Sequence, residues 1–161
     1  MTVEDYNRAV DEYADNLYRF VLKNLKDEHL SRDVVQDIFE KLWVKLETVS
    51  GSKVKTYLFT SAYHTLIDYI RRDKRFTGEE PVEANEPSHS SQYSDLVEVL
   101  GRAIHHLPED QRSVVMLRDY EGYSYREIAE ITGLTETQVK VYIYRARVFL
   151  KNYIGSMEKV I

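Results

Sequence analysis

The chain contains no cysteine, only three prolines and six glycines, and no long run of apolar residues. Without cysteine it cannot form a disulfide scaffold, a cysteine-ligated zinc site or a cysteine nucleophile, and this composition is typical of a reducing compartment. No apolar stretch reaches the roughly 18 residues that a membrane-spanning helix needs. The first residues, Met1–Asp5, are acidic and do not resemble a signal peptide. These absences predict a cytoplasmic protein.

The 161 residues include 43% hydrophobic and 12% aromatic side chains, which is enough for the packed cores of one or two small domains. The net charge is -5, whereas proteins that bind nucleic acids usually carry a basic field. The acidic excess is local, however, because residues 76–94 contain glutamates and no lysine or arginine. Residues 137–157 contain no acid and carry the cations Lys140, Arg145, Arg147 and Lys151. The total charge therefore does not exclude nucleic acid as a partner.

Residues 76–94 have the composition of a linker. The segment contains two of the three prolines together with Gly, Ser, Glu and Asn, and it shows no apolar period. It separates an N-terminal domain of residues 1–75 from a C-terminal domain of residues 95–161. We therefore expect two small domains joined by a flexible acidic linker.

The N-terminal domain is predicted to contain three helices. Apolar residues recur every three or four positions over residues 6–25, 34–46 and 54–70. Ser31 is the expected N-cap of the second helix, with Asp33 in its first turn, and Trp43 belongs to its apolar stripe. No alternating strand pattern competes with these periods, so the fold class is all-α.

The C-terminal domain carries two helix-start signals separated by a tight turn. Helices are predicted over residues 95–106 and 108–120, the second with Pro108 at its first position. Ser124 opens one capping box, Ser-Tyr-Arg-Glu, and Thr135 opens another, Thr-Glu-Thr-Gln, with Gly133 in the turn between them. A short helix, a glycine turn and a second helix together make a helix-turn-helix.

The second helix of this motif, from residue 135 to about residue 152, has two faces when residues are placed about 100° apart. The inward face is Val139, Ile143, Ala146 and Leu150, and the opposite face is Thr137, Lys140, Val141, Tyr144, Arg145 and Val148. A helix-turn-helix presents the N-terminal half of this helix to the major groove of DNA. Lys140 or Arg145 could bond guanine edges or phosphates, and Thr137 and Gln138 lie at the helix start, where N–H groups favour phosphate. The alternative is an ordinary solvated helix face.

These motifs resemble the sigma-70 family of RNA polymerase sigma factors, specifically its small two-domain extracytoplasmic-function (ECF) group. The C-terminal motifs are similar to the family's region 4, and they are Leu107–Arg112, Tyr123–Ala129, Gly133–Thr135, Val139–Lys140 and Arg145–Arg147. The N-terminal motifs are similar to its region 2, and they are Asp33–Phe39, Leu42–Trp43, Tyr57–Phe59 and Asp68–Arg72. The two signatures occur in the family's order over nearly the whole chain, which is more specific than either alone.

The resemblance implies a function in transcription initiation. Region 2 would dock on the β′ clamp helices of core RNA polymerase and melt the −10 promoter element, and region 4 would bind the −35 element and the polymerase β flap. Family members are usually held by an anti-sigma factor, often at a membrane, so such a partner is expected. The implied protein is an alternative sigma factor that is not an enzyme and uses no cofactor, metal or small-molecule substrate.

The resemblance also carries roles onto individual residues. The −35 contacts would come from Thr137, Gln138, Lys140, Val141, Tyr144 and Arg145. The −10 contacts would come from His64, Arg71, Arg72, Lys74 and Arg75, with Tyr63, Tyr69 and Phe76 as further stacking candidates. Polymerase docking would use acceptors on one face of the second helix, Asp33, Gln36, Asp37 and Glu40. The alternative for these acceptors is a solvated acidic helix start that complements the helix dipole.

Four positions depart from the family pattern. His64 stands where Asn is usual and Tyr57 where Trp is usual, so specificity for the −10 element can differ. Gln138 and Tyr142 replace the commoner Thr and Arg in the recognition helix, which leaves the −35 sequence open. The helical wheel places Tyr142 nearer the core side, so packing alone is its alternative role.

Three other functions compete with this interpretation. An enzyme or metal protein could use His64 with Asp68, or His105 with His106, but neither pair has a third ligand at metal-site spacing, and no glycine-rich phosphate loop occurs. A one-component regulator could use the same helix-turn-helix, yet it has no reason to carry the N-terminal signatures. An inactive relative could bind only a regulator. Co-purification with core RNA polymerase distinguishes the sigma factor from the one-component regulator.

Overall fold

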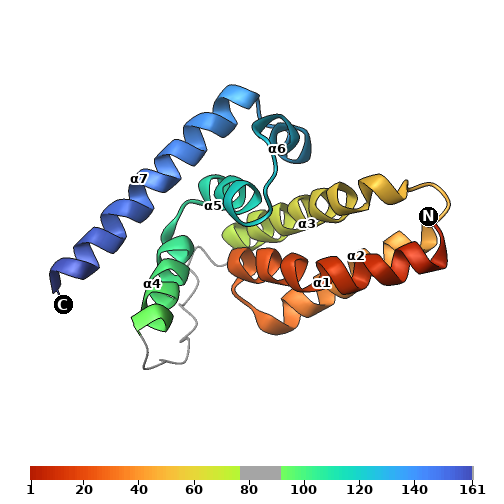
Figure 1. The fold of residues 1–161 in the computed structure, drawn as a ribbon, viewed down its shortest axis with the longest axis horizontal. Coiled ribbons are helices and arrows are strands. Elements are labelled where there is room, and N and C mark those ends of the chain that lie inside the picture. Colours follow the sequence, from red (N-terminus) through yellow and green to blue (C-terminus); the bar gives the residue numbers. More distant parts are fainter. Residues whose placement is uncertain (77–91, 161) are drawn as a thin grey trace. The chain divides into compact units, whose positions relative to one another are not determined.

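The computed structural model describes residues 1–76 and 92–160, and it divides into two compact units, Met1–Pro81 and Val82–Ile161 (Figure 1). All regular secondary structure in these described ranges is helical, which confirms the all-α fold class. Most of the predicted linker, residues 77–91, lies outside the described residues, but Phe76 and residues 92–94 at its two ends are helical. No helix within the described ranges is long and apolar enough to cross a membrane.

The N-terminal unit contains three long helices, α1 (Val3–Leu25), α2 (Glu28–Val44) and α3 (Val54–Phe76), and a turn of 3-10 helix, η1 (Gly51–Lys53). α1 packs against both α2 and α3 (Figure 1). The core forms where the three predicted apolar stripes meet, and its fully buried side chains include Leu17, Phe20, Leu42, Leu58 and Phe59. The rings of Phe20 and Phe59 meet edge to face with centroids 5.6 Å apart, which joins α1 to α3.

Two predictions about α2 are wrong. Its N-cap is Asp27 rather than Ser31, because the Asp27 carboxylate accepts a hydrogen bond from the Leu30 N–H at 3.0 Å. Lys26 adopts the left-handed conformation that ends α1, so α2 starts directly after it and Ser31 becomes a buried position inside the helix. Trp43 does not belong to the buried stripe, since 49% of it is exposed.

The C-terminal unit contains α4 (Gln92–His106), α5 (Glu109–Val115), α6 (Tyr125–Thr132) and α7 (Glu136–Val160). α5 continues into η2 (Met116–Tyr120), a turn of π-helix. α7 packs against α4, α5 and α6, so the core of this unit forms along one face of that long helix. Pro108 is the N-cap residue of α5 rather than its first helical residue, which moves the predicted start by one position.

A buried arginine joins α4 to α5. The Arg112 guanidinium donates hydrogen bonds to the carbonyls of Ile104, His105 and Leu107 at 3.1, 3.0 and 2.6 Å. These carbonyls lie at the C-terminal end of α4, where the helix dipole favours a cation. Burial lowers the pKa of Arg112, and the three hydrogen bonds compensate the guanidinium for the water that it has lost.

The predicted helix-turn-helix is confirmed in its local detail. At the start of α6 the Ser124 hydroxyl accepts from the Glu127 N–H at 3.1 Å, while the Glu127 carboxylate accepts from the Ser124 N–H at 3.0 Å. The Thr135–Gln138 box is built in the same way, with hydrogen bonds of 3.1 and 2.9 Å. Gly133 follows α6 at a φ of 79°, a conformation that favours glycine. The turn between α6 and α7 is therefore short and well defined.

Replacing Arg112 with alanine removes the donors for three carbonyls at the junction of α4 and α5. We expect the unfolding free energy of the C-terminal unit to fall by about 2–4 kcal/mol, because buried groups lose charged hydrogen bonds. Arg112→Lys should recover only part of this loss, since an ammonium cannot reproduce the planar fork of a guanidinium. Arg102→Ala, on the more exposed side of α4, is the control. Urea unfolding measures the change, and unaltered stability of Arg112→Ala would contradict this role.

Candidate DNA and polymerase interfaces

The two predicted faces of α7 are present in the structure. Val139, Ile143 and Ala146 are buried, and Leu150 is half-buried. The predicted contact residues on the other side are all exposed, namely Thr137, Gln138, Lys140, Val141, Tyr144 and Arg145. Gln138 also serves the helix cap, since its side-chain oxygen accepts from the Thr135 N–H. Every charged side chain over residues 137–156 is a cation, so this surface is suited to a polyanion.

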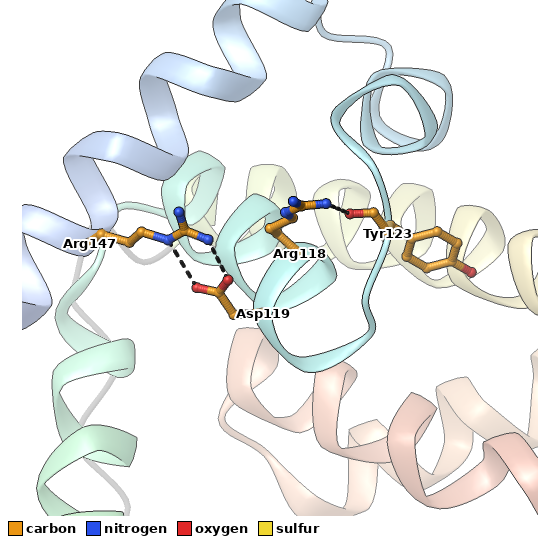
Figure 2. A network of polar contacts seen from close by, with 4 residues as sticks. All are labelled: Arg118, Asp119, Tyr123 and Arg147. Atoms are coloured by element: carbon orange, nitrogen blue, oxygen red, sulfur yellow. Dashed lines mark hydrogen bonds and ion pairs between the residues drawn. The ribbon is translucent and has the colours of Figure 1, made fainter.

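An ion pair joins α7 to η2 (Figure 2). Arg147 on α7 donates to both carboxylate oxygens of Asp119 on η2, at distances of 2.6 and 3.3 Å. The hydrogen bond to Asp119 raises the pKa of Arg147 further above its already high ordinary value. The two residues are 28 positions apart in the sequence. Because the contact is bidentate, it restrains the rotation of α7 about its own axis relative to η2.

Two further cations lie against the ring of Tyr125, the first residue of α6. The Arg118 guanidinium lies 4.7 Å from the centre of its ring and the Lys140 ammonium lies 5.7 Å from it, both within cation–π range. Arg118 also donates to the Tyr123 carbonyl at 2.9 Å (Figure 2). Three elements, η2, α6 and α7, therefore meet at one aromatic ring, on the edge of α7 that also carries Arg147.

The sequence did not predict the roles of Arg118, Asp119 and Tyr125. None of them is marked by an apolar period, and two of their contacts, Asp119 with Arg147 and Tyr125 with Lys140, join residues that are far apart along the chain. One signal was present, since Tyr125 directly follows the Ser124 N-cap and so lies at the entrance of the helix-turn-helix. Periodicity assigns faces to a single helix, but it does not show which side chain a neighbouring helix supplies.

The acceptors predicted on α2 are exposed. They are Asp33, Gln36, Asp37 and Glu40, and Asp33 lies beyond the first turn because the helix begins at Glu28. The Gln36 amide donates to the Glu40 carboxylate at 3.4 Å, and the Lys41 ammonium lies 3.3 Å from the Asp37 carboxylate. Both are surface contacts of small energy, so a partner can replace them at little cost.

The acceptor face of α2 continues into an exposed apolar surface. Trp43 is 49% exposed and Val44 is 83% exposed, and Trp43 follows Gln36 and Glu40 at helical spacing. The Trp43 ring meets the Tyr6 ring edge to face, with centroids 5.0 Å apart. A half-exposed tryptophan beside hydrogen-bond acceptors is typical of a protein-binding surface. The sequence did not predict this exposure because position 43 also fits the apolar period of the helix.

The predicted −10 residues follow one side of α3. His64, Arg71 and Arg72 are exposed, and the helical period aligns His64 with Arg71. The side chains of Lys74, Arg75 and Phe76 lie outside the described part of the chain. Tyr63 is buried and so belongs to the core, with its ring 5.6 Å from the ring of His64, whereas Tyr69 is partly exposed. In the described ranges no three histidine or acidic side chains are grouped to hold a metal ion.

Comparison with known proteins gives the family. The model described as Sigma-70 region 2 matches residues 9–76, and the model described as Sigma-70, region 4 matches residues 98–150. RNA polymerase sigma factor YlaC of Bacillus subtilis (strain 168) is 30% identical over 169 residues, which cover 98% of this chain and 95% of the relative. The chain belongs to the sigma-70 family.

Further relatives belong to the ECF group. ECF sigma factor SigM of Bacillus subtilis (strain 168) is 29% identical over 94% of both chains. The ECF sigma-E factor of Haemophilus influenzae is 30% identical over 94% of this chain and 88% of its own length. The solved structure of sigma factor RpoE with anti-sigma factor NepR from Bartonella quintana matches with a TM-score of 0.78 and 25% identity, covering 95% of this chain and 98% of that one. These findings confirm the predicted ECF sigma factor and favour it over a one-component regulator.

The contact between Asp119 and Arg147 should be measurable as a coupling free energy. Their side chains are 40% and 49% exposed, so we expect only about 0.5–1 kcal/mol from a double-mutant cycle of Asp119→Ala and Arg147→Ala. Added salt should reduce the coupling because it screens exposed charges. The looser pair Arg126–Glu130, 3.9 Å apart on α6, is the control and should give less. No coupling between Asp119 and Arg147 would mean that this ion pair does not restrain α7.

Proposed function

We propose that this protein is an alternative sigma factor of the ECF type, which binds core RNA polymerase and directs it to promoters through the −10 and −35 elements. One observation carries the proposal: two exposed helix faces of opposite chemistry, acceptors with a tryptophan on α2 and cations on α7. Residues 1–75 dock on core RNA polymerase and melt the −10 element, residues 76–94 connect the two domains, and residues 95–161 bind the −35 element.

Core RNA polymerase docks on the exposed face of α2. The acceptors of this face are Asp33, Gln36, Asp37 and Glu40, and they complement basic helices such as those that the family resemblance implies for the β′ clamp. Complementary charge speeds and orients the association. Trp43 adds an apolar anchor, because a large aromatic side chain that is half in solvent has much surface left to bury. The contact of region 4 with the β flap rests on the resemblance alone.

The cations of α3 hold the −10 element while its strands separate. Separation gives up stacking of about 1.4 kcal/mol per base-pair step, and a captured base recovers roughly 1–3 kcal/mol by stacking on an aromatic ring. Arg71 and Arg72 bind the phosphates, and Lys74 and Arg75 continue this cationic end of the helix. His64 lies two helical turns before Arg71 on the same side, where it can contact an unstacked base.

α7 lies in the major groove of the −35 element. The contacts come from Thr137, Gln138, Lys140, Val141, Tyr144 and Arg145. Lys140 binds phosphate rather than a base, because its ammonium is drawn to one edge of the helix over Tyr125, close to Arg118. Arg145 lies on the other edge and is free to reach either a guanine or a phosphate. The base-reading surface therefore lies between these two cations.

The protein acts by binding, without catalytic chemistry, cofactor or metal of its own. Its place of action is the bacterial cytoplasm, where core RNA polymerase and promoter DNA are found. A solved relative is bound to an anti-sigma factor, and we assign a partner of the same kind to this chain. Such a partner would inhibit transcription initiation by covering the exposed face of α2, the exposed face of α7, or both.

Asp33→Ala combined with Gln36→Ala should weaken binding to core RNA polymerase by about tenfold or more, which is about 1.4 kcal/mol. The acceptors that meet the basic partner are then missing, and Trp43→Ala should act in the same direction by removing the anchor. Asp11→Ala combined with Glu12→Ala, two exposed acids on α1, is the matched control and should leave binding unchanged. Competition for core polymerase measures the affinity; full affinity in the α2 variants would remove this face from the docking surface.

Lys140→Ala and Arg145→Ala should each reduce promoter-specific run-off transcription while leaving core binding intact. Loss of one phosphate contact also lowers the slope of log affinity against log salt by about 0.9, which is the result expected for Lys140→Ala. Arg8→Ala replaces a surface arginine of α1, paired with Asp5 at 3.9 Å, and is the control. An equal loss of core binding and transcription would show that the substitutions disturb folding rather than the −35 contact.

A further inference from the structure

An apolar ridge runs along the exposed side of α7. Val141, Tyr144 and Val148 are 39%, 71% and 41% exposed, and they recur at three- and four-residue spacing. They lie on the side opposite the buried Val139 and Ile143. A contiguous group of exposed apolar side chains usually marks a binding site. A partner that binds the ridge should therefore present apolar groups to it.

The charges around the ridge indicate what that occupant is. Lys140 lies at one rim, with its ammonium over the Tyr125 ring, and Arg145 lies at the other rim by helical position. No acid occurs over residues 137–156. The occupant must therefore carry negative charge on both flanks and apolar groups between them. The major groove of DNA has this arrangement, because phosphates line its edges and thymine methyl groups project from its floor.

Only the first turns of α7 are placed to reach base edges. Val141 is the sixth residue of the helix and Tyr144 the ninth. Their axial separation is about 4.5 Å, close to the spacing of about 3.4 Å between base pairs. Val148 lies about 10 Å further along the axis than Val141, past the N-terminal residues that a recognition helix places against base edges. Val141 and Tyr144 therefore face neighbouring base pairs, and Val148 lies beyond the bases.

We propose that Val141 is a specificity-determining residue that reads the C5-methyl group of one thymine and so selects an A·T pair within the −35 element. The inference rests on the proposed function of α7 in −35 binding. Valine has no donor or acceptor, so it gains nothing from the hydrogen-bonding edge of a G·C pair. The thymine methyl is the apolar group that base edges display in the major groove. Tyr144 covers the adjoining base step and excludes water from this contact.

Deoxyuridine differs from thymidine by this methyl group alone and gives a direct test. A −35 sequence is first selected from randomised promoter DNA with holoenzyme reconstituted from the full chain and core RNA polymerase. Each thymine of the selected element, on either strand, is then replaced in turn by deoxyuridine. We expect one position at which the replacement weakens binding about fourfold, the effect of one buried methyl group. The same replacement should have almost no effect on holoenzyme that carries Val141→Ala.

Val148→Ala is the matched control, because it is the same substitution on the same ridge but beyond the bases. It should keep the full sensitivity to deoxyuridine. The inference is overturned if no thymine of the element is sensitive, or if Val141→Ala stays as sensitive as the unsubstituted chain. In both cases a holoenzyme that still requires a −35 element leaves the proposed function standing. Failure to select any promoter sequence would overturn the proposed function together with this inference.

Discussion

The burial of one seam of α7 is the constraint on which the proposed DNA-binding face of that helix depends. Val139, Ile143 and Ala146 must be covered by the other helices of their unit, and this directs the opposite face of the helix outward. Gly133 and the capping box of Thr135 set the residue at which α7 begins. A shift of one position would rotate every side chain by about 100° and bring charged residues toward the core. The surface that we propose for DNA binding is thus a consequence of packing.

The same constraint produces the proposed docking face of α2. Val34, Ile38 and Leu42 are buried against α1 and α3, so the acceptors between them in the sequence face solvent. Each unit contains an amphipathic helix with an exposed outer face that we propose as its binding surface, and the two faces differ in charge. On α2, the hydrogen-bond acceptors and Trp43 are suited to a basic protein surface. On α7, the cations and the apolar ridge are suited to the major groove of DNA. Both proposed tasks are binding tasks, and such tasks do not require a cleft of reactive groups.

Local patterns predicted much of this structure, and contacts between distant residues account for what they missed. The two side chains of each capping box lie within four consecutive residues, so the sequence alone was enough to predict both boxes. The N-cap of α2 was misplaced because Asp27 and Ser31 are both good capping residues one turn apart, and the choice between them depends on where α1 ends. The cluster around Tyr125 could not be predicted, since η2 and α7 supply its cations. Trp43 fits the apolar period and is still half-exposed, and its described ring contact is with the ring of Tyr6 on α1.

The central claim is that the outer face of α7 lies on the −35 duplex when the chain is bound to core polymerase. The chain has no cysteine, so Glu136→Cys, at the exposed start of α7, gives a unique site for a DNA-cleaving iron chelate. Holoenzyme that carries this probe should cut promoter DNA within a few base pairs of the −35 element, whereas a probe at Ser156→Cys should cut there much less. A holoenzyme that initiates transcription while the Glu136→Cys probe leaves the −35 region uncut would contradict the account.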